Sequence, residues 1–154
     1  MNALSVYRLS HWFYERNLRV ASRIIDKINY LIFGCYLPGS ARIGHGCQIA
    51  YGGMSVVIHG DSIIGNYCMI GQTITLGAKE AYVSDQQKAS PIVGNDVYIS
   101  AGARLLGGIT IGDCSIIGAN AVVTSSFPPH SIIVGIPAKS VKKTDPDYRA
   151  IQRP

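Results

Sequence analysis

The chain of 154 residues is long enough to form one domain with a buried core. Its residues are 47% hydrophobic and 15% charged, a composition that excludes an intrinsically disordered protein. The net charge of +5 arises at the two ends, because residues 1–35 and 136–154 each contain five Lys or Arg against two acids, whereas residues 36–135 contain four against five. This neutral middle lacks the basic and aromatic pattern of a nucleic-acid surface, so we expect no nucleic-acid partner.

The four cysteines, at positions 35, 47, 68 and 114, show neither a CxxC pair nor any other metal-ligand spacing. We therefore expect no metal site and interpret these residues as buried free thiols of a reducing compartment. The N-terminus lacks the pattern of a secretory signal, and no apolar run approaches the roughly 18 residues of a membrane span. These observations favour a cytoplasmic protein.

The first segment, residues 1–38, has the mixed apolar and basic pattern of helices rather than strands. We predict two helices over roughly residues 4–33 that cap the rest of the domain. Trp12, Phe13 and Tyr14 lie together among basic residues, which also suggests weak association with an anionic membrane surface. A solvated cap is the simpler of these two interpretations.

Beyond this segment an apolar residue recurs every six positions, and a small residue usually follows it. The apolar anchors are Ile43, Ile49, Ile58, Ile64, Ile70, Leu76, Val93, Ile99, Leu105, Ile111, Ile117 and Val123. A period of six fits one short strand per repeat with the anchor pointing inward, and the small residue lets the backbone turn a corner. Hexapeptide repeats of this kind predict an all-β solenoid, a parallel β-helix, over residues 39–138.

Two interruptions break this period and one histidine departs from it. Nine residues separate Ile49 from Ile58, and seventeen separate Leu76 from Val93. Insertions in solenoids form outer loops that often build the binding face, so we expect a protruding arm over residues 78–90. His59 stands directly after the first interruption, at a position that glycine occupies in the following repeats. Residues 139–154 form a basic C-terminal tail in this interpretation.

Residues 41–143 resemble the hexapeptide-repeat acyltransferases, and the branch they are most similar to contains serine acetyltransferases and the O-acetyltransferases of polysaccharide synthesis. The resemblance depends on the phrases ARIGHG, VVIHGDSIIGNYCMIGQTITLG, IVGNDVYISAGARLLGGITIGDCSIIGANAVV and PPHSIIVGIPAK. It implies a left-handed β-helix, a homotrimer, acetyl-CoA as the acyl donor, and active sites in grooves between neighbouring subunits.

The resemblance to serine acetyltransferases fails at their histidines. In an ungapped comparison, Ala50 and Tyr51 stand where that family has an Asp-His pair. The second histidine of that family would align near Lys88, Ala89 and Ser90, where this chain has no histidine. The combination of YGG with VVIH is instead similar to a sugar-modifying branch. We therefore expect transfer of acetyl to a sugar hydroxyl in capsule, exopolysaccharide or lipopolysaccharide synthesis.

His59 is the candidate general base, because a neutral imidazole suits removal of a hydroxyl proton at neutral pH. It follows an inward anchor and should project from a corner of the solenoid beside a loop, although an ordinary surface hydrogen bond is the alternative. Tyr51 and His45 are candidates for acceptor binding, with packing roles as their alternatives. His130 is expected chiefly to order its turn. We expect direct transfer without a covalent intermediate.

For the donor, the resemblance implies that the backbone of Ala101, Gly102 and Ala119 lines the pantetheine of acetyl-CoA. Lys139 and Lys142 would meet its phosphates. The small residues could equally be simple corner requirements. Two further readings of the whole chain stay open at this point: a serine O-acetyltransferase with a displaced histidine, and a non-catalytic hexapeptide-repeat scaffold.

Overall fold

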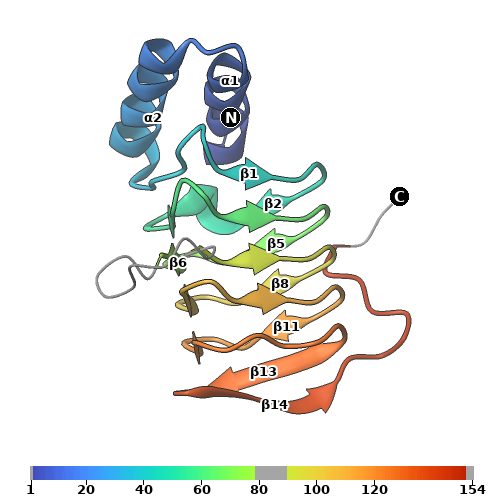
Figure 1. The fold of residues 1–154 in the computed structure, drawn as a ribbon. Helices are drawn as coiled ribbons and strands as arrows, with labels where there is room; N and C mark the ends of the chain where they lie inside the picture. The colour runs from blue at the N-terminus through green and yellow to red at the C-terminus, as the bar shows by residue number, and fades with distance from the viewer. Residues whose placement is uncertain (1, 79–89, 152–154) are drawn as a thin grey trace.

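The chain forms a left-handed parallel β-helix with two helices at its N-terminal end, as the sequence predicts (Figure 1). The computed structural model describes residues 2–78 and 90–151. Successive strands pass to the next of three sheets, so each coil of the solenoid consists of three short strands and three corners. Most of the predicted arm, residues 79–89, lies outside the described residues.

The chain enters the three sheets in turn, and they are called first, second and third in that order. The first sheet contains β1 (Arg42–Ile43), β4 (Ile63–Ile64), β7 (Ile92–Val93) and β10 (Thr110–Ile111). The second contains β2 (Gln48–Ile49), β5 (Met69–Ile70), β8 (Tyr98–Ile99), β11 (Ile116–Ile117), β13 (Ser131–Gly135) and β14 (Ala138–Lys143). The third contains β3 (Val57–Ile58), β6 (Thr75–Gly77), β9 (Arg104–Leu106) and β12 (Val122–Val123).

The apolar anchors fill the interior of this three-sided solenoid. Each anchor is a strand residue, and anchors stack in register from coil to coil, for example Ile43 on Ile64 and Ile64 on Val93. All are buried except Ile49, which is half-buried beside the single turn of 3-10 helix at Ala50–Gly53. Each coil thus covers the apolar face of its neighbour, and this burial is the main stabilising term of a solenoid.

The helical cap consists of α1 (Ala3–Glu15) and α2 (Arg19–Phe33). Asn2 caps α1 by accepting a hydrogen bond from the Ser5 backbone N–H, and Gly34 ends α2 in the left-handed conformation that glycine favours. The buried Tyr7 hydroxyl ties α1 to the first coil, because it donates to the Ala41 carbonyl at 2.7 Å and accepts from the Ile43 N–H. The cap therefore covers the open end of the solenoid at β1.

The other end of the solenoid is closed by an antiparallel pair, β13 with β14. The boundary that the sequence suggested between residues 138 and 139 falls within β14, so the first residues of the predicted basic tail belong to the second sheet. Residues 144–151 run back along the solenoid (Figure 1). Among the described residues, neither helix is long and apolar enough to span a bilayer.

Candidate functional site

Three rows of corners run along the solenoid, and each row offers a different chemistry. The asparagine edge joins the first sheet to the second and contains Asn66, Asn95 and Asp113. The alanine edge joins the second sheet to the third and contains Ala101 and Ala119. The histidine edge joins the third sheet to the first and contains His59 between β3 and β4.

The small residue after the anchor is required by close stacking of backbones on two of these edges. On the asparagine edge, a Cβ added at Gly65 would lie 2.5 Å from the Gly94 carbonyl oxygen. On the alanine edge, a Cβ at Gly71 would lie 2.7 Å from the Ala101 nitrogen. Neither separation is sterically allowed, so glycine is needed there for the approach of the next coil, and not only for turning the corner.

The histidine edge is different, and this difference explains how an imidazole can replace glycine. The equivalent positions there are His59, Gly77, Leu106 and Thr124, which vary widely in size. A Cβ at Gly77 would meet only the end of the Leu106 side chain, at 3.1 Å. Gly77 and Leu106 belong to strands β6 and β9, so a side chain at this position projects outward before the corner begins.

His59 lies in a polar environment at this edge. Its Nδ1 accepts a hydrogen bond from the Asp61 backbone N–H at 3.3 Å, and it lies 2.9 Å from the Ser90 Oγ and 3.9 Å from the Asp61 carboxylate. Ser90 is 4% exposed, and the His59 side chain is 30% exposed. The ring is therefore fixed by a buried hydroxyl and a neighbouring carboxylate while part of it faces solvent.

These contacts bear on what the imidazole can do. In a serine hydrolase triad the nucleophilic hydroxyl and the carboxylate approach opposite ring nitrogens. Here Ser90 and Asp61 approach the same nitrogen, Nδ1, so they do not form a triad with His59. When His59 is protonated, Nδ1–H can donate to Ser90 Oγ and face the Asp61 carboxylate. This arrangement suits an oriented base rather than an acyl-enzyme nucleophile.

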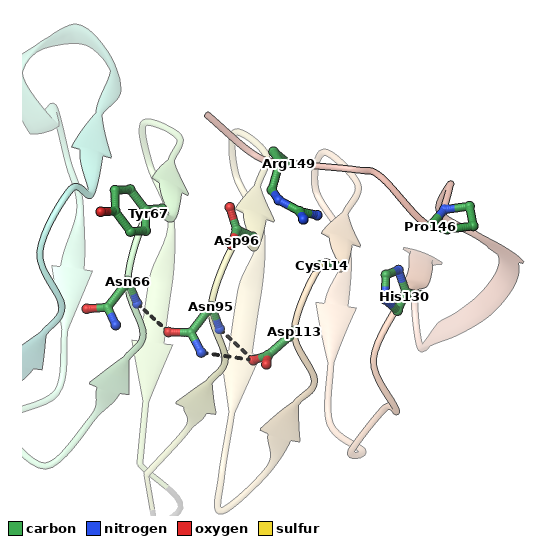
Figure 2. Close-up of a pocket in the computed structure, with 9 residues that line it drawn as sticks. All are labelled: Asn66, Tyr67, Asn95, Asp96, Asp113, Cys114, His130, Pro146 and Arg149. Atoms are coloured by element: carbon green, nitrogen blue, oxygen red, sulfur yellow. Dashed lines mark hydrogen bonds between the residues drawn. The ribbon is translucent and has the colours of Figure 1, made fainter. Parts of the chain in front are cut away.

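The asparagine edge holds the other solenoid histidines and a separate pocket of about 460 Å³ (Figure 2). His45 packs edge-on against Tyr67 with ring centroids 4.9 Å apart. His130 lines the pocket, and its Nδ1 is 3.1 Å from the Thr144 Oγ1, which fits the predicted turn-ordering role. Because this edge and the histidine edge are different corners of the solenoid, the fold does not bring His45 or His130 beside His59 within one chain.

A polar ladder along the same edge gives this pocket a structural explanation. The Asn66 N–H donates to the Asn95 Oδ1 at 2.8 Å, and the Asn95 N–H donates to the Asp113 Oδ1 at 2.7 Å (Figure 2). Each side chain thus satisfies a corner N–H of the preceding coil. Arg149 and Pro146 of the C-terminal segment also line the pocket.

The alanine edge contains the residues predicted to bind acetyl-CoA and the acceptor candidate Tyr51. Ala101, Gly102 and Ala119 lie in consecutive corners, joined by a hydrogen bond from the Asn120 N–H to the Ala101 carbonyl. Gly102 has φ of +73°, a conformation that favours glycine. Tyr51 is 78% exposed, so it has no packing role within its own chain.

The two lysines proposed for phosphate contacts lie on β14 at different distances from this edge. Lys139 pairs with Val134, whose side chain touches the position of Gly118 beside Ala119. Lys142 pairs with Ile132, nearer the start of β13 and the asparagine edge. The fold thus places Lys139 at the alanine edge and Lys142 away from it.

A second cavity, of about 500 Å³, is lined in part by residues 60–63, which directly follow His59 in the sequence. It lies between the C-terminal half of α1 and the first coils of the solenoid, and its charged side chains are Glu15, Arg42 and Asp61. Asp61 therefore both lines this cavity and approaches the His59 ring. Cationic and anionic groups face the same space, which suits a small ligand with both charges.

Two of the four cysteines, Cys35 and Cys68, are unsuited to act as nucleophiles. Cys68 is buried, and the hydrogen bond that its thiol donates to Cys47, together with burial, raises the pKa of Cys68, so it stays protonated at neutral pH. Burial raises the pKa of Cys35 to about 11. Within residues 2–78 and 90–151, no group of three or more His, Cys, Asp and Glu side chains could hold a metal ion.

Sequence reasoning identified His59 but not its partners. Ser90 lies 31 positions after His59, at the end of the predicted arm, so the six-residue repeat does not relate the two residues. The one available signal was that Ser90 falls near the site of the second histidine of the serine acetyltransferases. Asp61 was visible two residues after His59, but the sequence does not show that its carboxylate turns toward the ring.

Comparison with known proteins supports one branch of the resemblance. Residues 90–125 match the family model described as bacterial transferase hexapeptide (six repeats). A serine acetyltransferase from Synechococcus elongatus is 37% identical over 142 residues, covering 92% of this chain and 57% of the relative. The Helicobacter pylori serine acetyltransferase is 38% identical over 143 residues, with 93% and 81% covered.

The fold agrees with these matches. A crystal structure of the Brucella abortus serine acetyltransferase in complex with coenzyme A superposes with a TM-score of 0.85 at 28% identity. The match covers 93% of this chain and 56% of the other, so the chain spans little more than half the length of several of these relatives.

These findings correct the expected function. The prediction of a sugar hydroxyl in polysaccharide synthesis is wrong, because the relatives over more than nine-tenths of the chain are serine acetyltransferases. The error came from treating the missing Asp-His pair at Ala50 and Tyr51 as decisive, although the identity extends through the cap and the whole solenoid. The chain belongs to the serine acetyltransferase family of hexapeptide-repeat acyltransferases.

Proposed function

We propose that the protein is an acetyl-CoA-dependent serine O-acetyltransferase in which His59 is the general base. Family membership supports the reaction, and the observation that supports the residue is the contact of His59 with Ser90 and Asp61 on an outward-facing edge. The four cysteines all lie among the described residues and form no disulfide, in keeping with a reaction in the reducing cytoplasm, where we place it.

The reaction needs one proton acceptor and no covalent intermediate. The serine hydroxyl oxygen attacks the thioester carbonyl carbon while its proton moves to His59. The tetrahedral intermediate then breaks its carbon–sulfur bond, and the imidazolium returns the proton to the departing CoA thiolate. Ser90 and the Asp61 carboxylate, both beside Nδ1, stabilise the imidazolium between these steps.

The separation of the edges supports a site shared between subunits. His59 lies on the histidine edge, whereas Ala101, Gly102, Ala119 and Lys139 lie at the alanine edge of the same chain. A homotrimer that sets the histidine edge of one copy against the alanine edge of the next brings base and thioester together. Tyr51, exposed on the alanine edge, then faces His59 of the neighbouring copy.

The cavity beside Asp61 is the proposed acceptor pocket. A free amino acid carries a carboxylate, which the Arg42 guanidinium can bind in a bidentate manner, and an ammonium group, which Asp61 or Glu15 can pair. A neutral sugar would leave these charges unmatched. The pocket therefore favours an amino-acid acceptor.

The test is thiol release from acetyl-CoA by the purified protein, measured with L-serine and with neutral sugars as acceptors. We expect release that depends on L-serine and the formation of O-acetylserine. Absence of release with L-serine, or equal release with a sugar, would refute the proposed acceptor. Acetyl-CoA binding measured by calorimetry separates this outcome from a non-catalytic scaffold, which would bind no acetyl-CoA.

A further inference from the structure

Helix α2 is amphipathic, but its apolar side faces outward. The only fully buried residues of α2 are Ser22 and Asn29, which contact α1: Ser22 accepts a hydrogen bond from Ser10, and Asn29 donates to the Ala3 carbonyl. Figure 1 shows α2 on the outer side of the cap, beside α1. The two fully buried residues of α2 are therefore polar, and most of its aliphatic side chains stay exposed.

Those side chains form one stripe along the helix. Val20, Ile24, Ile28 and Leu31 recur at helical spacing and are 72%, 55%, 44% and 80% exposed. A soluble monomer rarely leaves a contiguous aliphatic patch of this kind in water, because the exposed area opposes folding and solubility. Something of complementary chemistry should cover it.

A row of cations runs beside the stripe. Arg19, Arg23 and Lys27 recur every four residues and are exposed. The acid of α2, Asp26, turns inward instead, where it accepts hydrogen bonds from the Ser10 hydroxyl at 2.5 Å and the Gly39 N–H at 3.1 Å. The outward side of α2 is consequently apolar and cationic, with no carboxylate.

Aromatic and basic residues of α1 and the loop after it extend this character. Trp12 is 45% exposed, and the Arg16 guanidinium lies 3.9 Å from the centroid of its ring. Leu18, in the loop between the helices, is 50% exposed. Tryptophan paired with arginine is characteristic of the interface between lipid headgroups and acyl chains.

We propose that the outward face of α2, with Trp12 and Leu18, binds the surface of an anionic lipid bilayer. The apolar stripe enters the headgroup region, and the row of Arg19, Arg23 and Lys27 pairs with lipid phosphates. A second copy of this face would present the same row of cations, and the carboxylate of α2, Asp26, is turned inward and bonded to Ser10 and Gly39, so it does not pair with them. An anionic membrane matches both the apolar stripe and the charge, and it leaves the solenoid edges accessible.

The experiment measures sedimentation of the full chain with vesicles of phosphatidylcholine, with and without phosphatidylglycerol. We expect binding to the anionic vesicles only. Replacing Arg19, Arg23 and Lys27 together by Gln should weaken partitioning roughly 100-fold. The double change Ile24→Ser and Ile28→Ser should also weaken it while the circular dichroism spectrum stays that of the wild type.

The matched controls lie at the far end of the solenoid. Replacing Lys139, Lys142 and Lys143 by Gln removes the same charge, and Ile136→Ser alters an apolar residue that is 73% exposed. Neither should change vesicle binding. Equal loss in the lysine control, or no binding by the wild type, would overturn the proposal. If Ile24→Ser and Ile28→Ser instead change the oligomeric mass measured by light scattering and leave vesicle binding intact, the face lies between copies of the chain.

Discussion

The corners of this solenoid are of two kinds, which differ in how closely the backbones of successive coils approach one another. At the asparagine and alanine edges, the residue after the anchor meets the backbone of the next coil, as Gly65 and Gly71 do. At the histidine edge the backbones are less crowded, because Gly77 and Leu106 still belong to strands at this position, and glycine, leucine, threonine and histidine all occur there. A large side chain is therefore accommodated more readily at the histidine edge than at the other two. His59 stands at this edge.

The largest effect that this comparison predicts is on catalysis. His59→Ala should lower kcat about 100- to 10,000-fold, because the acceptor hydroxyl loses its base. His45→Ala and His130→Ala, both on the asparagine edge, should change kcat no more than a few-fold. The measurement is steady-state thiol release with L-serine. Retained turnover in His59→Ala, or an equal loss in His45→Ala, would remove the distinction between the edges.

The next prediction concerns stability and compares two glycines. Gly65→Ala should destabilise the fold by about 2–4 kcal/mol, since its Cβ would overlap the Gly94 carbonyl and force the coils apart. Gly77→Ala, at the histidine edge, should cost less than about 1 kcal/mol because only a flexible leucine side chain must move. Urea unfolding followed by circular dichroism measures both. Similar losses would show that the edges are equally crowded.

A smaller effect is expected at Ser90. Ser90→Ala should lower kcat about 10-fold while the KM for L-serine stays constant, because the hydroxyl orients the His59 ring and does not touch the acceptor. Ser90→Thr keeps a hydroxyl and should restore most of the activity. A change confined to KM, or a failure of threonine to restore kcat, would contradict the positioning role.

The smallest effect is expected at two buried serines that occupy the same place in their repeats. Among the described residues, the Ser62 hydroxyl, two positions before Ile64, is buried without a hydrogen-bond partner, whereas the Ser115 hydroxyl, two before Ile117, accepts from the Ser131 N–H at 3.1 Å. Ser62→Ala should leave stability unchanged or raise it by about 1 kcal/mol, and Ser115→Ala should lower it by about 1 kcal/mol. If urea unfolding shows that Ser62→Ala lowers the stability and Ser115→Ala raises it, this account of the two hydroxyls is wrong.

The sequence predicted the solenoid well because its determinant is local. An apolar residue recurring every six positions specifies short strands whose anchor points inward. The anchors from Ile43 to Val123 occupy such strand positions in the structure. The two cap helices follow equally from their own residues. The antiparallel closing strand Ala138–Lys143 was missed, because Pro128 and Pro129 end the period and nothing in the pattern predicts a reversal.

The site could be predicted only in part, because its contacts are not local. His59 was conspicuous as a break in the repeat, but counting repeats does not show that His45, Tyr51 and His59 lie on three different edges. Ser90 reaches His59 only through the stacking of coils. The pocket proposed for the acceptor needs α1 to pack beside Asp61, a tertiary contact that no spacing in the sequence reveals.

The most direct test of the central claim is activity after mixing two inactive variants. One variant is His59→Ala on the histidine edge, and the other is Ala119→Trp, which fills the exposed alanine edge. After subunit exchange, verified by native mass spectrometry, a shared site in a trimer should restore about a quarter of wild-type activity, since one site in four combines two intact edges. If exchanged trimers stay as inactive as the separate variants, His59 and the alanine edge do not form one site between subunits.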